Sequence, residues 1–348
     1  DRDVTIQLIN MTSSTYVVDY AEKYENASKR ITVENIDDLS SRVDLQTKYN
    51  ITSTGSLIVI KSGEKEKTLT TSDLYTYSTS KQIDKTEEAF TNAIVEVTTD
   101  ERPHIYILSG KSYYNTEQAL STVIQELKDE ANDVDYLDIL TKGSIPEECL
   151  VITTLNKDLD DIEKDKIIEY INNGGKLMIM SSQNMLEFET PNFNQVLAQY
   201  GIKIGYGAIF EQDGSKMLQN SPDMIIENVS ANFMSSLDMS LKACFIDAGK
   251  IEFEDADKLS DLGVEYETIA STSDKAFVRT KFDAKTTSRT ENDGEEGSAI
   301  IGAYVNKKIS DEKNSQLIIY SNEIFATNLT LQISAYYTYA SELYNNKD

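Results

Sequence analysis

The 348-residue chain is poor in the residue types that most enzyme sites use, with two cysteines, one histidine and no tryptophan. Histidine is the usual general base near neutral pH, but His104 follows Pro103 at an expected strand start, which favours a structural role. Cys149 and Cys244 lie in apolar runs and are expected as core residues without a disulfide. Since no G-x-S-x-G sequence is present either, catalysis by a Ser-His-Asp or Cys-His arrangement is not expected.

Basic residues are also scarce, at 33 against 59 acidic ones, which gives a formal net charge of -26. This excess repels phosphate backbones, so a nucleic acid partner is not expected. The sequence has no zinc-type spacing, no calcium loop and no phosphate loop, because Gly174-Gly175 follows a helix instead of preceding one. We therefore expect no cofactor and no metal. No apolar run reaches the 18 residues that would indicate a membrane helix, and no signal peptide opens the chain.

The most informative segment is 157–182, which predicts one helix-strand step of a layered sheet. Asp158 or Asp160 can cap the helix, and Gly174-Gly175 ends it. Lys176 to Met180 then reads as a buried strand. The expected apolar stripe of the helix consists of Ile162, Ile167, Ile168 and Ile171.

Residues 1–82 predict a small first domain with the order βαβαββ. Its strands are expected at 3–11, 31–35, 56–60 and 65–69, and its helices at 15–26 and 39–49. This order resembles a thioredoxin-like domain. In that family a CxxC precedes the first helix, where this chain has Thr12 to Thr15, and a cis-Pro precedes the third strand, where it has Thr54-Gly55. The resemblance therefore implies a redox-inert scaffold or docking domain.

Residues 83–330 predict a second, larger α/β domain, because helices and strands alternate along most of it. Such alternation indicates a three-layer αβα domain with a mostly parallel sheet, of the amidotransferase or flavodoxin-like kind. An irregular insertion is expected around 205–297, and its polar end, 283–297, reads as a mobile surface loop. Residues 331–348 are expected to form a C-terminal helix. The expected strands are 104–108, 134–140, 150–154, 176–180, 299–305 and 316–320, and the expected helices are 85–97, 117–129, 158–172 and 193–200.

In open α/β sheets, ligands bind in the crevice beyond the carboxyl ends of the strands. Three polar segments are expected there, each directly after a predicted strand, and two tyrosines would rim them. The alternative, that these are ordinary loops over a sheet edge, stays open. The candidate ligand-binding residues are Ser109, Gly110, Lys111, Tyr113, Tyr114, Asn156, Ser181, Ser182, Gln183 and Asn184.

The ordered series of segments resembles one known family along nearly the whole chain. TNAIVEVT is followed by IYILSGKSYYN, then by residues 144–182 and QVLAQYGIKI, and finally by QLIIYSNEIFATN. This series is similar to the extracytoplasmic region of the gliding-motility-type auxiliary component of ABC transporters. Many members carry Gly-His-Gly-Glu after the strand, where this chain has Gly110 to Tyr113. If that loop binds a ligand through His and Glu in the family, this chain lacks the means.

The resemblance implies a non-enzymatic subunit that is anchored in the cell membrane by flanking helices absent from this sequence, with this region extracytoplasmic. It implies transporter permease and ATPase subunits as partners, and an extracellular polymer or a small ligand as a further binding partner. Two alternatives remain. A carboxylate-dependent hydrolase or transferase acting on an extracellular glycan would require two acids with raised pKa values in the crevice. A soluble substrate-binding protein would require two similar lobes, and the unlike halves argue against it.

Overall fold

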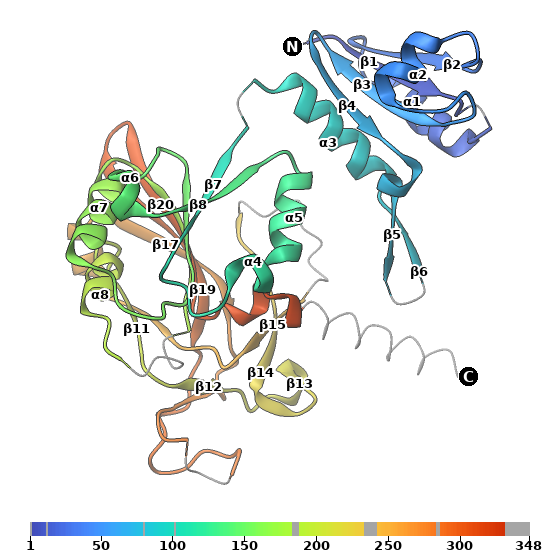
Figure 1. The fold of residues 1–348 in the computed structure, drawn as a ribbon. Helices are drawn as coiled ribbons and strands as arrows, with labels where there is room; N and C mark the ends of the chain where they lie inside the picture. Colours follow the sequence, from blue (N-terminus) through green and yellow to red (C-terminus); the bar gives the residue numbers. More distant parts are fainter. Residues whose placement is uncertain are drawn as a thin grey trace, which may run out of the picture. The chain divides into compact units, whose positions relative to one another are not determined.

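The computed structural model describes residues 2–11, 13–78, 81–100, 102–182, 188–232, 242–282 and 286–330. The chain divides into two compact units (Figure 1). Within the described ranges, the first unit runs to Pro103 and includes 125–133, while the second contains 104–124 and the chain from Val134 on. No helix of the described residues is long and apolar enough to cross a membrane. The predicted C-terminal helix, 331–348, lies outside the described residues.

The first unit is built on a four-stranded sheet with the order β2-β1-β3-β4. The central strand β1 pairs in parallel with β2 and antiparallel with β3, and β3 turns into β4 at Gly63, whose φ is +59°. A 3₁₀ turn at Thr71–Leu74 leads into the two-stranded hairpin of β5 and β6. The strands are β1 (Val4–Ile9), β2 (Ile31–Ile36), β3 (Leu57–Ser62), β4 (Lys65–Leu69), β5 (Tyr75–Ser78) and β6 (Lys81–Asp84).

Three helices accompany this sheet, so the predicted βαβαββ order is present and is followed by a helix. They are α1 (Thr15–Ala27), α2 (Val43–Tyr49) and α3 (Thr86–Thr98). Phe90, Ala93 and Val97 of α3 join the same buried cluster as Ile6 and Ile60 of the sheet. This packing corrects the expected boundary at residue 82, because α3 belongs to the first unit and the second begins after Pro103.

The second unit contains a nine-stranded sheet, in which eight strands have the order β11-β16-β19-β20-β10-β9-β7-β8 and the ninth, β17, pairs with β19. Strands β7, β9, β10 and β20 pair in parallel, whereas β16, β17 and β19 continue the sheet antiparallel. The predicted α/β class is confirmed, and the strands expected near residues 300 and 316 belong to this sheet. Its strands are β7 (His104–Leu108), β8 (Asp133–Leu137), β9 (Cys149–Ile152), β10 (Lys176–Met180), β11 (Ile202–Ile204), β16 (Ile251–Phe253), β17 (Val264–Ser271), β19 (Ile300–Ser310) and β20 (Lys313–Tyr320).

One face of this sheet is covered by helices that share a buried cluster with it. Ile167 and Ile171 of α7 and Phe193 of α8 pack there with Leu177 and Leu317 of the strands. The helices of the unit are α4 (Thr116–Ala119), α5 (Ser121–Asp129, which crosses the boundary between the units), α6 (Ile139–Lys142), α7 (Asp161–Asn172), α8 (Pro191–Ala198) and α9 (Ala256–Asp261), and a 3₁₀ turn spans Ile324–Ala326.

Helix α7 and strand β10 form as predicted, but one residue of α7 and one nearby strand differ from the prediction. Asp160 caps α7 in a reciprocal arrangement with Glu163. Ile162 is 62% exposed and leaves the predicted apolar stripe, because it lies in the first turn on the outer side. The strand predicted at 134–140 ends early, because the Asp138 side chain accepts hydrogen bonds from the backbone of Leu140 and Thr141 and thereby caps α6.

Short strands pack against the opposite face, in the region where an irregular insertion was expected. Ile209, Ile225 and Phe245 join a second buried cluster with Ile301 and Tyr320 of the large sheet. Two small sheets make up this layer, with orders β12-β18 and β13-β14-β15. Their strands are β12 (Ala208–Phe210), β13 (Met217–Leu218), β14 (Ser221–Asn228), β15 (Lys242–Ile246) and β18 (Phe277–Arg279), and a 3₁₀ turn spans Gly214–Lys216.

The polar segment 283–297 was expected to be a mobile surface loop, but its described part, 286–297, is anchored by a buried side chain. The Arg279 side chain donates to the carbonyls of Thr286 and Ser288 and forms an ion pair with Asp293 at 2.8 Å. Both side chains of that pair are almost fully buried, and the pKa of Asp293 is held far below its usual range by its bonds to Arg279. A buried arginine therefore ties this segment to β18.

Candidate functional site

The loop after β7 carries the first group of predicted site residues, and its lysine turns inward. Lys111 is 3% exposed, and its ammonium lies 2.7 Å from Glu163 and 3.0 Å from Asp160 at the start of α7. Burial lowers the pKa of Lys111, but the hydrogen bonds to Glu163 and Asp160 outweigh burial, so the pKa is raised. Lys111 therefore holds the loop to α7 and presents no free charge to a ligand.

Asn156 holds the same loop to the segment after β9. Its backbone amide donates to the Lys111 carbonyl at 2.6 Å, and its side-chain amide donates to the Ser112 carbonyl at 2.9 Å. Gly110 has a φ of +72°, which favours glycine at the turn out of β7. The backbone amide of Ser109 donates to the Leu137 carbonyl at 2.9 Å, beside β8. These three residues therefore help to fix the shape of the loop.

The two tyrosines differ in exposure. Tyr113 is 48% exposed, whereas Tyr114 is half-buried, and their rings meet edge to face with centroids 5.1 Å apart. Burial raises the pKa of Tyr114, and the charges of Glu323 and Asp247 add to this effect. Of the two tyrosines predicted to rim a crevice, one ring is therefore exposed and the other lies within electrostatic reach of two acids.

The serines after β10 are buried within the protein. Ser181 and Ser182 are both 0% exposed. The Ser182 amide donates to the Thr154 hydroxyl at 3.0 Å, and the Ser182 hydroxyl accepts a long hydrogen bond of 3.3 Å from the Glu323 amide. Gln183 and Asn184, the other two predicted residues of this group, lie outside the described residues.

These bonds lead to Glu323, which the sequence prediction missed. Glu323 follows β20, is 0% exposed, and accepts a hydrogen bond of 2.9 Å from the Thr154 amide through Oε2. Its Oε1 atom finds no donor among the described residues, and no cation in that part of the chain pairs with the carboxylate. Burial raises the pKa of Glu323 to about 7, although the bonds to Thr154 oppose that rise.

A second acid lies in the turn after β15. Asp247 has a φ of +54°, and its pKa is raised by burial and by the charge of Asp223. The turn is tied to the end of β20, because Asn322 donates to the Ile246 carbonyl and the Gly249 amide donates to the Ser321 carbonyl at 3.1 Å. We call Tyr114, Thr154, Ser182, Asp247 and Glu323 the Glu323 cluster.

The Glu323 cluster lies at the carboxyl ends of β9, β10 and β20, where the sequence predicted a crevice. A carboxyl group with a pKa near 7 can both donate and accept a proton under neutral conditions. One feature of the sequence could have pointed to Glu323, since it follows directly after a predicted strand, together with Ser321 and Asn322. The sequence does not reveal that β20 lies next to β10, so Glu323 was not among the predicted site residues.

Comparisons with known proteins agree with the predicted resemblance for part of the chain. Residues 102–241 match a family described as an ABC-type uncharacterized transport system. Over that segment, the match agrees with the predicted resemblance to a component of ABC transport systems. No curated protein sequence matches the chain.

Several solved structures are similar at low sequence identity. The mmIFT52 N-terminal domain has a TM-score of 0.48 and 13% identity, covering 65% of this chain and 88% of its own. A ThuA-like protein from Bacteroides uniformis ATCC 8492 has a TM-score of 0.39 and 12% identity, covering 66% and 84%. A ThuA-like protein from Parabacteroides merdae ATCC 43184 has 0.35 and 11%, covering 65% and 84%. Similarities this weak carry no information on function.

Proposed function

We propose that this chain is the non-enzymatic, extracytoplasmic region of a membrane-anchored auxiliary subunit, which binds a partner in an ABC-type transport assembly with permease and ATPase subunits. The observation that carries the proposal is the family match over residues 102–241. That segment contains the loop after β7 and the ends of β9 and β10, and so contributes Tyr114, Thr154 and Ser182 to the Glu323 cluster.

The use of side chains at the sheet end supports a binding role. The ammonium of Lys111 already forms ion pairs with residues at the start of α7. Ser182 already forms hydrogen bonds with Thr154 and Glu323. His104 lies at the other end of β7, with its Nε2 2.8 Å from Asp135. The histidine therefore lies at the opposite end of the sheet from Ser181 and Ser182, which follow β10. Tyr113 is 48% exposed at this end, and exposed aromatic side chains are common at the centres of protein interfaces.

The test is a mild-detergent co-purification of the full-length protein from its own host, read by mass spectrometry. We expect an ATPase and a multi-span permease to be recovered with it, and we expect Tyr113→Ser to reduce their recovery. Tyr136→Ser is a matched control, because Tyr136 is a similarly exposed tyrosine, at 37%, on β8. Recovery of the protein alone, or with wall polymer only, contradicts the proposal.

A specific observation favours a second function, that of a carboxylate-dependent hydrolase or transferase acting on an extracellular glycan. Burial raises the pKa values of both Glu323 and Asp247, and both charges act on Tyr114. A carboxyl that titrates near neutral pH suits general acid catalysis. The test is incubation of the purified protein with host wall glycan, followed by analysis of new reducing ends. Products that vanish in Glu323→Gln and in Asp247→Asn support it, and the absence of any product rules it out.

A further inference from the structure

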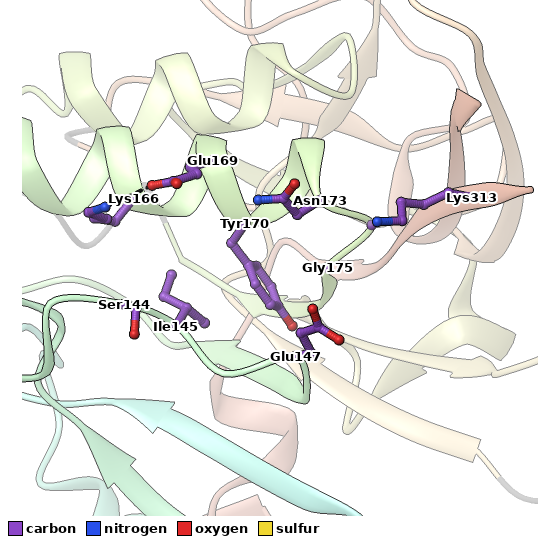
Figure 2. A pocket seen from close by; sticks show the side chains of 10 residues that line it. Ser144, Ile145, Glu147, Lys166, Glu169, Tyr170, Asn173, Gly175 and Lys313 are labelled. Carbon is purple, nitrogen blue, oxygen red and sulfur yellow. Dashed lines mark hydrogen bonds and ion pairs between the residues drawn. The ribbon is translucent and has the colours of Figure 1, made fainter.

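A cavity of about 380 Å³ lies at the opposite end of the large sheet from the Glu323 cluster. It is lined by residues 144–147 before β9, by the second half of α7 with the Gly174-Gly175 turn, and by Lys313 at the start of β20 (Figure 2). Because these segments adjoin the amino ends of β9, β10 and β20, this cavity shares no residue with the site described above.

One side of the cavity is formed by the ring of Tyr170, which is fixed in place. The Tyr170 hydroxyl accepts a hydrogen bond of 3.0 Å from the Lys176 amide and donates to the Glu148 carbonyl. Gly175 packs directly against the ring, and any Cβ at that position would overlap it. The ring therefore needs no rearrangement to receive a ligand, which lowers the cost of binding.

The cavity presents a cation and an anion that the protein does not pair. Within the described parts of the chain, neither Lys313 nor Glu147 has a partner of opposite charge within ion-pair distance, whereas Lys166 and Glu169 pair with each other at 2.8 Å. The stem of Lys313 lies across Gly174, since its Cγ is 2.8 Å from the place of a Cβ there. Figure 2 shows Lys313 reaching in from the hairpin and Glu147 from the loop before β9.

The carboxyl-terminal end of α7 also faces this cavity. The carboxyl-terminal end of a helix carries partial negative charge, which favours a cationic group nearby. Glu147 and Glu169 would repel a simple anion, while Lys313 and Lys166 would repel a simple cation. A ligand with one charge of each sign is attracted by both halves of the cavity.

We propose that this cavity binds a small zwitterion of the amino acid or dipeptide type, with its carboxylate at Lys313 and its ammonium toward Glu147 and the end of α7. A volume of about 380 Å³ is at the lower end of the range for small-molecule sites, which is roughly 300–1,000 Å³. The proposal goes beyond the function proposed above, since it concerns different residues and does not depend on transporter partners.

The experiment is a calorimetric titration of the purified chain with L-alanine and with L-alanyl-L-alanine. We expect saturable binding of at least one of them, and a loss of about tenfold in affinity for Lys313→Met and for Glu147→Gln. N-acetyl-L-alanine amide, which lacks both charges, is expected not to bind. Lys308→Met is the control, because Lys308 lies on the same hairpin outside the cavity and pairs with Asp311 at 2.7 Å.

Three results would overturn the proposal: no saturable binding of either probe, equal binding of the uncharged probe, or unchanged affinity in both charge variants. Both substitutions are at exposed side chains, so the fold is expected to survive, and far-ultraviolet circular dichroism of each variant checks this. Co-purification with transporter subunits is a separate measurement, so failure of the zwitterion site and failure of the proposed function are distinguishable.

Discussion

Replacing Glu323 by glutamine should remove a pH-dependent penalty on stability. In the folded protein, burial raises the pKa of Glu323 from 4.5 to about 7. Between these two values the folded state holds a proton that the unfolded state has released. The stability contributed by this group is therefore complete below pH 4.5 and is lost as the pH rises through 7. Glutamine keeps the shape of the side chain but does not titrate.

The size of the effect follows from the two pKa values. A difference of about 2.5 units corresponds to about 3 kcal/mol in the free energy of unfolding, since one unit is worth about 1.4 kcal/mol. About 2.5 kcal/mol of this falls between pH 5 and pH 8. Glutamine also leaves one buried polar atom unsatisfied, but that cost is the same at both pH values and cancels from the comparison.

The assay is thermal unfolding of the wild type and Glu323→Gln at pH 5 and pH 8, followed by circular dichroism. Relative to the wild type, the variant should gain roughly 5–10 °C in Tm on going from pH 5 to pH 8, given about 2–4 °C per kcal/mol for a unit of this size. Glu312→Gln, in the exposed turn between β19 and β20, is the control and should show no such gain. A Tm difference between variant and wild type that is the same at both pH values would refute the reasoning.

Two further predictions concern buried ion pairs. Lys111→Met leaves Glu163, which is 2% exposed, without its cation, so urea unfolding should show a loss of about 3–5 kcal/mol in the free energy of unfolding. Adding Glu163→Gln should restore much of this loss, because no buried charge is then left unpaired. A loss below about 1 kcal/mol in Lys111→Met would contradict this. Arg279→Met should release segment 286–297 and speed trypsin cleavage at Arg289, whereas Lys275→Met, which removes an exposed pair with Asp213, should not; equal cleavage rates would count against the anchoring role.

The sequence was sufficient for elements whose signals are local. Capping residues and a Gly-Gly stop bound α7, and a short apolar run defines β10, so both are close to their predicted positions. The boundary at residue 82 was misplaced because the apolar face of α3 does not reveal which sheet it covers. Likewise, the composition of 286–297 is typical of a mobile loop, and its anchor, Arg279, lies outside the segment.

The sequence indicated which loops follow the strands of the large sheet but not what their side chains contact. Side chains after β7 and β10 were chosen correctly as lying at the strand ends, yet Lys111 and Ser182 serve the protein's own structure. The sequence contains no information on which strand ends adjoin, so the acid contributed by β20 was not included. A single residue on a distant strand therefore changes the chemistry of the site.

Glu323 also bears on the argument that a chain with a single histidine lacks a general base. The single His104 argued against Ser-His-Asp and Cys-His catalysis and left a carboxylate-dependent enzyme as the alternative. A buried carboxyl with a pKa of about 7 has the proton affinity that such an enzyme needs of a general base near neutral pH. Lys111 and Glu163 compensate each other at the neighbouring helix, whereas Glu323 has no such partner among the described residues and destabilises the fold above pH 7. Proteins commonly retain such uncompensated groups at functional sites. One variant can therefore distinguish the two proposed functions. Glu323→Gln should abolish turnover of a glycan but leave the recovery of transporter subunits unchanged.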